Sequence, residues 1–547
     1  MSSKIKYQKN YTEFNETYQL VLPLSLEGLV PDDDSVRLLS HELEELDYTL
    51  LYKAYSSKGR NPAVDPKTMF KILTYAYSQN IYSSRKIEKA CLRDINFMWL
   101  LAGQKAPDHS TIARFRTGFL LEACEDLFYQ MVRRLKDAGE LSVETVFIDG
   151  TKLEACANKY TFVWKKSVGK WEEKMFQKIQ EAVLFLNHEY MQSFSVKIDS
   201  RIQDLQTITR YLENKCQQDG TVFVYGRGKR KSKNQKYFEL FRKFQERQVT
   251  YDWHTASFQG RNNYCKTDPD ATFMHMKDDH MLNGQLKPAY NLQHAVNSGF
   301  IVAAGIFPNP TDVMTLKPFL NQMEEDLSFP FERIVCDAGY ESEENLSFLR
   351  AKGIEAYIKP ANYEQIGTKK FAKEIGRKEN MRYDKEQDCY LCHNGKEIKR
   401  SGSRRVKTAS GYIREETQYA CNECGGCPYK EKCMSGKNWK KPLEERYKKL
   451  TVSRLFEELR EEEYRRINSE EGKKLRMNRS IQAEGGFADI KGDSGFTRFL
   501  CKGTENVFAE YILYAMAHNL GWLHSRIQND KLDLHLYELK EEETEAA

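Results

Sequence analysis

The stretch VETVFIDGTK at Val143–Lys152 decides the fold, because it predicts a short buried strand that ends in a carboxylate. Its apolar residues run directly into Asp149, which is followed by Gly150. The stretch FERIVCDAGY at Phe331–Tyr340 repeats this order and reaches its own carboxylate at Asp337. Apolar runs of this kind are typical of strands covered on both faces, and ligands of open α/β sheets bind beyond the carboxyl ends of such strands.

If the two strands are neighbours, Asp149 and Asp337 converge on one edge of a sheet. Carboxylates held that close repel each other strongly unless a divalent cation lies between them. The pair therefore predicts an oxygen-ligand site for Mg²⁺ or Mn²⁺. The alternative is that each aspartate only caps the helix or turn that follows it.

Length and composition set wide limits. The chain has 547 residues, enough for roughly three domains. Its 84 Lys and Arg against 79 Asp and Glu give a net charge of only +5, so global charge does not indicate a nucleic-acid binder. The first residues contain no apolar signal segment, and no window approaches the ~18 apolar residues of a membrane span. We expect a cytoplasmic protein that has no membrane segment and, if it binds DNA, is associated with the bacterial nucleoid.

The region from about Asp34 to Ala138 has helical periodicity throughout. The stretches SSRKIEKACLRDINFMWLLAG and APDHSTIARFRTGFL predict two short helices joined by a tight turn, with Arg114 and Arg116 early in the second. This arrangement favours a helix-turn-helix that binds DNA. An ordinary helical bundle with solvated arginines is the alternative.

After the first aspartate the chain leaves the predicted sheet. Residues 164–216 have apolar positions at helical spacing and predict long helices whose charges form a solvated face. The loop Gly226–Lys236, GRGKRKSKNQK, is strongly basic and predicts phosphate binding, unless it serves only solubility. Its DNA-binding candidates are Arg227, Lys229, Arg230 and Lys231.

The sheet resumes at Leu286–Ile306, where two apolar runs separated by Asn297-Ser298-Gly299 predict an antiparallel hairpin. A helix then leads into the strand that ends at Asp337, and a further helix and strand follow at Ser342–Ile358. The fold class is therefore α/β, with a mixed sheet flanked by helices.

Residues 359–446 are basic, loop-rich and bear clustered cysteines. Their spacing is typical of zinc ribbons, and four thiolates would complete one structural zinc site. Buried free thiols and, less favoured, an iron–sulfur cluster are the alternatives. The zinc candidates are Cys389, Cys392, Cys421, Cys424, Cys427 and Cys433.

A charged helical region ends in RMNRSIQAEGGFADIKGDSGFTRF, where Glu484 and Lys491 fall on one helical face together with two apolar residues. Gly485 and Gly486 weaken this helix and predict a close backbone approach. The helix Val507–Leu523 is the most apolar of the C-terminal region, and its Glu510 is either paired with a nearby cation or an alternative to Glu484. The tail from Glu538 is acidic, which predicts disorder.

Together with GRNPAVDPKTMFKILTYAYS, PDHSTIARFR, and TDPDATFMHMKD followed by YNLQHAV, these motifs make the chain resemble the DDE transposases of bacterial insertion sequences over nearly its whole length. The resemblance implies a ribonuclease H-like catalytic domain in which TDPDATFMHMKD and YNLQHAV are the second and third strands. It implies catalysis and metal binding by Asp149, Asp337 and Glu484, and contact of Lys491 with the DNA backbone. In the family an arginine is separated from the glutamate by three residues; here that place is Ser480, the arginine is Arg479, and Met477 stands where the family has a tyrosine.

The resemblance also implies DNA strand cleavage and strand transfer with two Mg²⁺ or Mn²⁺ ions. The DNA partners it implies are terminal inverted repeats and target DNA, and the protein is expected to form a homodimer in the DNA complex. Two other functions stay open, a catalytically silent DNA-binding zinc protein and a nuclease that only hydrolyses. The expected regions are a helical DNA-binding domain (1–140), a first catalytic part (141–160), a helical basic insertion (161–260), a second catalytic part (261–360), a cysteine-rich insertion (361–450), C-terminal catalytic helices (451–530) and an acidic tail (531–547).

Overall fold

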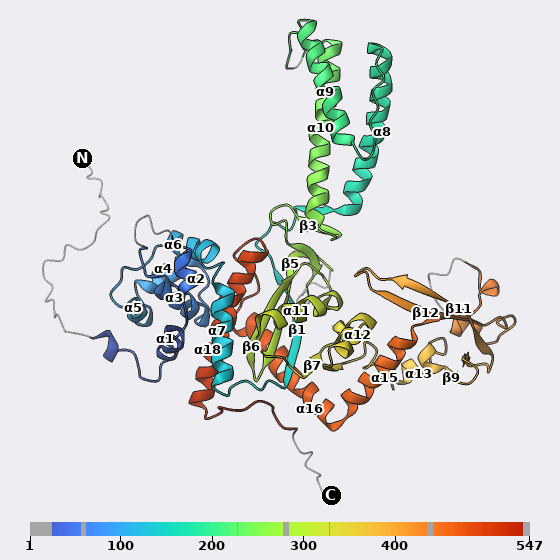
Figure 1. The fold of residues 1–547 in the computed structure, drawn as a ribbon. Coiled ribbons are helices and arrows are strands. Elements are labelled where there is room, and N and C mark those ends of the chain that lie inside the picture. Colours follow the sequence, from blue (N-terminus) through green and yellow to red (C-terminus); the bar gives the residue numbers. More distant parts are fainter. Residues whose placement is uncertain are drawn as a thin grey trace, which may run out of the picture.

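The computed structural model describes residues 25–55, 62–226, 228–276, 284–327, 329–434 and 441–539. These residues form a mixed central sheet, a helical N-terminal layer, a projecting helical arm and a separate small sheet (Figure 1). Arg227 lies outside the described residues, so its predicted role has no structural counterpart. Among the described helices, none has the length and apolar character that crossing a membrane requires.

Strand β1 (Thr145–Glu154) lies in the middle of the central sheet. It is antiparallel to β5 (Leu286–Asn297) and parallel to β7 (Arg333–Cys336), which in turn is parallel to β8 (Glu355–Ile358). The outer edge of β5 pairs with β6 (Phe300–Phe307) and, nearer its start, with the short β4 (Thr272–His275). This mixed topology is consistent with the predicted ribonuclease H-like fold. In chain order, β4 from TDPDATFMHMKD and β5, which contains YNLQHAV, are the second and third strands of this sheet, as the resemblance implied.

The predicted hairpin between β5 and β6 is confirmed. Its turn residues Ser298 and Gly299 have φ values of 56° and 83°, which is the left-handed backbone that two-residue hairpin turns require. A Cβ atom on Gly299 would lie 2.5 Å from Nε1 of Trp522, so only glycine fits there. The turn is thereby held against the C-terminal helix α18 (Thr504–Gln528).

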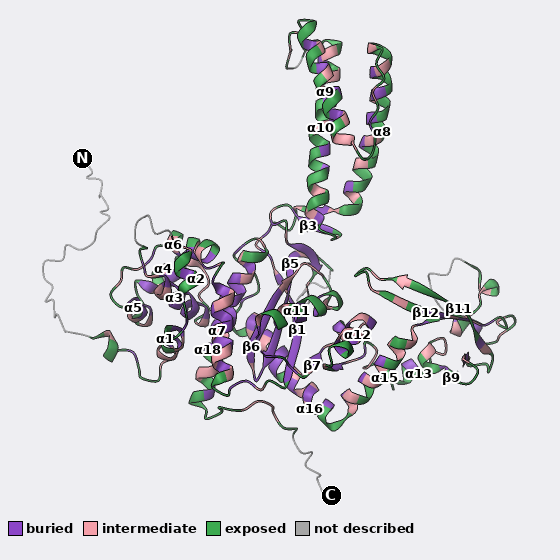
Figure 2. Cartoon of the chain, in the orientation of Figure 1, coloured by how far each residue is buried: buried purple, intermediate pink, exposed green. Residues whose placement is uncertain are grey.

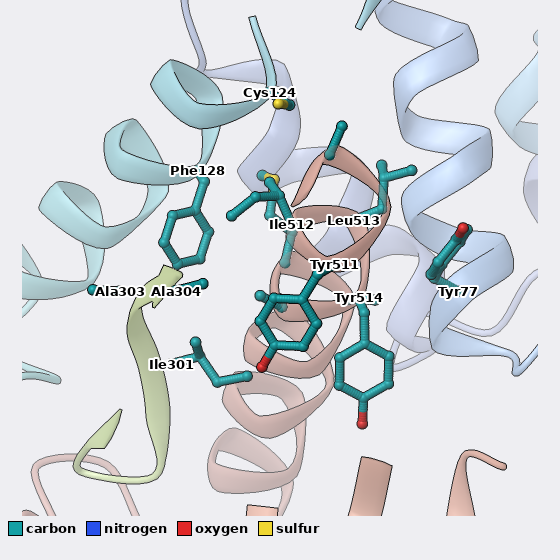
Figure 3. Packing of buried hydrophobic residues seen from close by; sticks show 14 of the residues in the cluster. Tyr77, Cys124, Phe128, Ile301, Ala303, Ala304, Tyr511, Ile512, Leu513 and Tyr514 are labelled. Carbon is teal, nitrogen blue, oxygen red and sulfur yellow. The ribbon is translucent and has the colours of Figure 1, made fainter. Parts of the chain in front are cut away.

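Helix α18 is buried between the N-terminal layer and the sheet (Figure 3). Tyr511 and Tyr514 are buried on it, Tyr77 approaches from the N-terminal layer, and Ile301 and Ala303 approach from β6. An all-round apolar helix needs cover on every side, which explains why the predicted core helix lies here. The predicted helical N-terminal region is confirmed as α1 (Ser35–Glu44), α2 (Thr49–Lys53), α3 (Pro66–Ser78), α4 (Ser84–Cys91), α5 (Ile95–Leu101), α6 (His109–Arg114) and α7 (Cys124–Asp137).

The arm contains α8 (Lys165–Tyr190), α9 (Arg201–Gln218) and α10 (Lys233–Phe258), and β2 (Phe162–Trp164) pairs with β3 (Asn263–Cys265) at its base. Its buried residues, among them Ile179, Leu212 and Phe241, form a core of their own. Figure 2 shows this core as a narrow buried strip between exposed outer faces. The prediction of long helices over residues 164–216 is confirmed by α8 and α9, and α10 packs with them in one core.

The cysteine-rich region is rich in turns and loops, as expected, but it also contains a five-stranded sheet that was not predicted. Its strands are β9 (Arg382–Asp384), β10 (Cys389–Leu391), β11 (Glu397–Lys407), β12 (Ile413–Ala420) and β13 (Lys449–Val452), paired in the order β13-β12-β11-β10-β9. Charged residues occupy much of β11 and β12, and this hides the apolar alternation that marks a strand. The small core includes Tyr390, Tyr419 and Val452.

The remaining helices surround the sheet. They are α11 (Leu316–Asp326), α12 (Glu343–Ala351), α13 (Lys369–Ala372), α14 (Lys430–Cys433), α15 (Arg454–Asn468), α16 (Glu470–Arg479) and α17 (Gly485–Ala488). Two π-helical segments, Ser480–Glu484 and Asp489–Asp493, make one continuous helical run from α16 through α17. Short 3-10 turns lie at Leu26–Gly28, Asp312–Met314, Ala338–Tyr340, Lys378–Asn380 and Leu443–Glu445.

Residues 531–538 cross the back of this helical run as a strap. The backbone N–H of Tyr537 donates to Oδ1 of Asn478 at 2.8 Å, and Nδ2 of Asn478 donates to the Tyr537 carbonyl at 2.9 Å. Arg526 forms a buried ion pair with Glu140 at 2.8 Å just before the strap. The part of the predicted tail up to Leu539 is thus packed, whereas 540–547 lie outside the described residues.

Candidate active site

The two predicted aspartates lie side by side. The parallel register of β1 and β7 ends with Ile148 opposite Cys336, so Asp149 and Asp337 follow as the next pair. Each carboxylate accepts a hydrogen bond from the next backbone N–H through its Oδ1, Asp149 from Gly150 at 2.8 Å and Asp337 from Ala338 at 2.7 Å. The prediction that the two strands are neighbours is confirmed.

Glu484 reaches the same place from the continuous helical run. Arg479 lies between the two acids, with Nη1 3.7 Å from Oδ2 of Asp149 and Nη2 in an ion pair with Glu484. The hydroxyl of Ser480 donates to Oε2 of Glu484 at 3.0 Å. The side chain of Arg479 is only 13% exposed, so its guanidinium balances two carboxylates in a partly dehydrated position.

The electrostatics join these groups into one neighbourhood. Burial raises the pKa of the Cys336 thiol, the positive charge of Arg479 lowers it, and the charges of Asp149 and Asp337 raise it again. The pKa of the Tyr340 hydroxyl is likewise raised, first by burial and then by nearby carboxylates that include both aspartates. Both side chains therefore stay neutral beside the acidic pair, and neither adds charge to it.

The apolar side of the helical run is fastened to β5 beside Asp149. His294 pairs with Asp149 across the strands, and its ring stacks on Phe487 with a centroid separation of 3.7 Å. Burial lowers the pKa of His294 to about 3, so the ring is neutral at physiological pH. Phe487 is buried while Glu484 is exposed, which gives this stretch the predicted division into an apolar and a polar side.

The glycines beside Glu484 do not meet a close backbone. A Cβ atom on Gly485 would lie 3.9 Å from its nearest neighbour, and one on Gly486 would lie 3.6 Å from His294. The expectation of a close backbone approach at these two glycines is therefore wrong. The two π-helical segments that flank α17 are the local irregularity, and such segments often occur at functional sites.

A buried polar cluster supports the aspartates from behind, and the sequence reasoning missed it. Oδ1 of Asp312 accepts hydrogen bonds from Nδ2 of Asn291 at 2.8 Å and from Nε2 of Gln293 at 3.0 Å. The Tyr340 hydroxyl donates to Oε1 of Gln293. A Cβ atom on Gly150 would lie 2.8 Å from Asp312 and 3.0 Å from Tyr340, which explains the glycine after Asp149.

The signal for this cluster was present in the sequence. Asn291 and Gln293 lie on one face of a strand that is predicted to be buried, and a buried amide needs a polar partner.

The site suits a hard divalent cation. Asp149, Asp337 and Glu484 offer only oxygen donors, and the ion pairs of Arg479 show that Asp149 and Glu484 already require a positive charge. Within the described residues, no group of three or more His, Cys, Asp or Glu side chains is arranged to hold a metal ion. Glu484 points at Arg479 and Ser480 and would have to turn to join the two aspartates.

Glu510 occupies a different place from Glu484. It is buried on α18, where it accepts hydrogen bonds from the backbone N–H groups of Leu500 and Cys501 at 2.9 to 3.1 Å. Burial raises its pKa, and the charge of Arg116 lowers it. The reading of Glu510 as a carboxylate stabilised by a nearby cation fits this position.

Of the predicted helix-turn-helix arginines, only Arg114 is exposed. Arg116 is 6% exposed and donates to the Tyr77 hydroxyl at 3.2 Å and to the Tyr82 carbonyl at 2.9 Å. Its position makes it part of the contact between the N-terminal layer and α18. The expectation that Arg116 contacts DNA is corrected, because an arginine inside a core has no surface to offer.

Two of the basic side chains in and beside the Gly226–Lys236 loop form ion pairs within the protein. Lys231 forms an ion pair with Glu239 at 2.5 Å, and Lys233 pairs with Glu189 at 2.7 Å. Lys229 and Arg230 are exposed. The acidic partners come from the arm helices, which the local sequence of the loop could not reveal.

Five of the six candidate thiols influence one another. The pKa of Cys421 is raised to about 11, chiefly by burial and in part by Cys424 and Cys392. The pKa of Cys433 is raised by burial and by Cys392, Cys424 and Cys427. The pKa of Cys389 is raised by burial and then by Glu397 and Asp384, not by the other thiols. Its neighbours differ because strand alternation puts it on the opposite face from Tyr390 and Cys392.

Comparison with known protein families gives two matches. Residues 24–118 match the model described as "Transposase domain (DUF772)", and residues 391–524 match the model described as "Transposase DDE domain". No curated protein and no solved structure matches the chain. The two matches define a transposase with an N-terminal transposase domain and a DDE domain. Each match covers less than half of the chain, and both are to transposase families.

Proposed function

We propose that this transposase cuts DNA at the ends of an insertion sequence and joins the freed ends to target DNA, with Asp149, Asp337 and Glu484 as its catalytic acids. The DDE domain implies transposition and a divalent metal. The observation that supports the finer proposal is the register of β1 and β7, whose last pair, Ile148 and Cys336, comes directly before Asp149 and Asp337. Arg479 in turn links Asp149 to Glu484.

The three acids would hold two Mg²⁺ or Mn²⁺ ions, which when bound supply Lewis acidity at the scissile phosphate. The chain's own residues provide position. The sheet fixes the aspartates, and Glu484 approaches across the gap that Arg479 spans. A water or 3′-hydroxyl oxygen attacks phosphorus in line while the opposite P–O bond breaks, and the leaving oxygen takes up a proton.

Several cations are available for the DNA. Lys491 lies two turns beyond Glu484 and is partly exposed, so it can meet the backbone next to the cut. Arg114, Lys229 and Arg230 are exposed on the N-terminal layer and the arm tip. Arg479 already contacts two acids, and on this proposal its guanidinium turns toward the phosphate when the acids bind metal.

The test is strand cleavage by the purified protein on a duplex that carries the DNA flanking its gene, with Mg²⁺ or with EDTA. We expect metal-dependent nicks at fixed positions near inverted repeats and joined products when target DNA is added. Nicks without joined products would indicate a nuclease that only hydrolyses. Specific binding without nicks would indicate a catalytically silent DNA-binding protein.

For the cysteine-rich sheet we propose a structural zinc ion held by four of Cys392, Cys421, Cys424, Cys427 and Cys433. These described thiols are not arranged as a metal site in the structure, so on this proposal they move together when zinc binds. Three of these thiols pack in one small core, and Sγ of Cys424 also accepts from the Lys448 N–H at 3.3 Å. A core this small needs an additional crosslink. Elemental analysis should find about one zinc per chain, since four thiolates complete one tetrahedral site.

The paired variants Cys424→Ser and Cys389→Ser sharpen this test. Cys424→Ser should lose the zinc and lower the melting temperature, whereas Cys389→Ser should keep the zinc, because Cys389 lies on the other face of β10. A wild-type protein that is folded and free of zinc would contradict the proposal.

A further inference from the structure

The helical arm carries more positive charge than the rest of the chain. Residues 165–258 contain 18 Lys and Arg against 11 Asp and Glu, a surplus of seven, while the whole chain has a net charge of +5. The remainder of the chain is therefore slightly acidic. An excess of this kind on one projecting element marks an electrostatic contact surface for a polyanion.

The excess is ordered on α8. Lys166, Lys170, Lys174 and Lys178 follow one another at intervals of four residues, and all four are exposed. Residues four apart lie on neighbouring turns of one helix side. This lysine stripe faces away from the buried α8 residues Met175 and Ile179, which point into the core of the arm.

The charges of the stripe are not used within the protein. Among the residues that the structure describes, none forms an ion pair or hydrogen bond with the side chain of Lys166, Lys170, Lys174 or Lys178. Several other cations of the arm are paired. Lys215 lies 3.5 Å from Asp219, Arg242 lies 3.1 Å from Glu246, and Lys231 and Lys233 also have acidic partners.

The stripe begins close to the catalytic sheet. The chain passes from Asp149 along β1 to Glu154 and, after β2, enters α8 at Lys165. Figure 1 shows the arm rising from the end of the sheet to which β1 leads. A duplex that crosses Asp149 and Asp337 and continues past this end of the sheet can run along α8.

We infer that the lysine stripe binds the phosphates of duplex DNA that extends from the catalytic site, which makes the arm a sequence-independent DNA clamp. This inference rests on the proposed function, since it assigns to the same DNA a second contact. The stripe spans 12 residues, about 18 Å at 1.5 Å per residue, which corresponds to roughly five base pairs of duplex. Lysine suits this use as a point charge without base preference.

The test measures the salt dependence of DNA binding by the full-length protein. The probes are duplexes of about 40 base pairs, long enough to cover site and arm at 3.4 Å per base pair, one of random sequence and one from the gene flank. Replacing all four lysines by Gln should weaken binding of both probes about tenfold or more and lower the salt slope by about 0.9 per lost phosphate contact. Replacing them by Arg should preserve both quantities.

A matched control removes the same number of charges from the same arm. Lys215, Lys231, Lys233 and Arg242 changed together to Gln should leave most of the salt slope, because these cations are already paired with carboxylates. Melting curves would establish that each variant is folded. Equal slopes for the wild type and the stripe variant would overturn the inference.

The two proposals fail in different ways. If the wild type cleaves flank DNA while the stripe variant binds with an unchanged slope, the clamp is refuted and the catalytic proposal stands. If the wild type binds DNA through the stripe and never cleaves it, the catalytic proposal fails alone. A stripe variant that loses self-association without DNA and keeps its salt slope would show a protein interface in place of the clamp.

Discussion

The aspartates and the glutamate of the candidate site are held by different kinds of structure. Asp149 and Asp337 are fixed by the register of two buried strands and by the Asp312 cluster behind them. Glu484 is exposed on a helical run with two π-helical segments and is held by Arg479 and Ser480. The comparison teaches that two acids are preorganised by the core, whereas the third depends on side chains that can rearrange.

The largest effect should come from removing a carboxylate. Asp149→Asn, Asp337→Asn and Glu484→Gln each keep size and remove one metal ligand, so we expect cleavage with Mg²⁺ to fall by several orders of magnitude. Folding should survive, because carboxylate repulsion is relieved.

Glu510→Gln is the matched control for Glu484→Gln. Glu510 is a buried acceptor of two backbone N–H groups, so this change should lower the melting temperature. At temperatures where the variant is folded, it should still cleave DNA. If Glu484→Gln retained cleavage and Glu510→Gln lost it, the third catalytic carboxylate would be Glu510 on α18. The comparison between buried aspartates and an exposed glutamate would then be wrong.

A glycine beside each kind of acid gives the next test. Gly150→Ala forces a Cβ atom against Asp312 and Tyr340, which should cost about 1–3 kcal/mol of stability. Displacing Asp149 by the same change should reduce cleavage roughly a hundredfold.

Gly485→Ala, next to Glu484, should stabilise the protein and leave cleavage nearly unchanged. Its Cβ atom has 3.9 Å of clearance, and alanine favours a helix by about 0.5–1 kcal/mol over glycine. Urea unfolding and cleavage rates measure both variants. Similar losses in the two would show that strand and helix hold their acids equally tightly.

The strap offers a smaller and more specific perturbation of the helix. Asn478→Ala removes both hydrogen bonds to Tyr537, which should lower the free energy of unfolding by about 1–3 kcal/mol because the partners are left buried. Cleavage should fall less than in Gly150→Ala. Lys474→Ala, which loses only the surface pair with Glu538, should stay within about 1 kcal/mol of the wild type.

The smallest effect is a pH dependence where α15 meets the sheet. Burial raises the pKa of Glu463 from 4.5 to about 7, so the folded state keeps a proton that the unfolded state has already lost. The stabilisation from this proton is complete below about pH 4.5 and is lost as the pH rises through 7. The melting temperature of Glu463→Gln relative to the wild type should therefore increase between pH 5 and pH 7.5. Glu462→Gln on the exposed side should show no such trend.

The sequence was sufficient for whatever depends on local pattern. Both aspartate strands, the β5–β6 hairpin and the N-terminal helices follow from apolar runs and turn residues that lie within a few positions of one another. Asp149 and Asp337 could be paired because each follows the same kind of strand.

The predictions that were wrong or missing concern residues whose partners are distant in the sequence. The burial of Arg116 requires α18, and the neutralised Lys231 requires Glu239 from the next helix. The strands β11 and β12 are recognisable only once paired, since their charged faces hide the alternation. The Asp312 cluster joins residues of three elements, and patterns within a single segment do not reveal such a contact.

The contact between the N-terminal layer and α18 also has a consequence for synthesis. Tyr77 and Glu510 meet in the finished protein although 433 residues separate them. At ribosomal speeds of about 5–20 residues per second, the N-terminal layer waits roughly 20 to 90 seconds for the helix that covers it. During that interval its face around Tyr77 and Arg116 is open to chaperones and to other nascent chains. Translation rate should therefore influence how much of this transposase reaches the folded state.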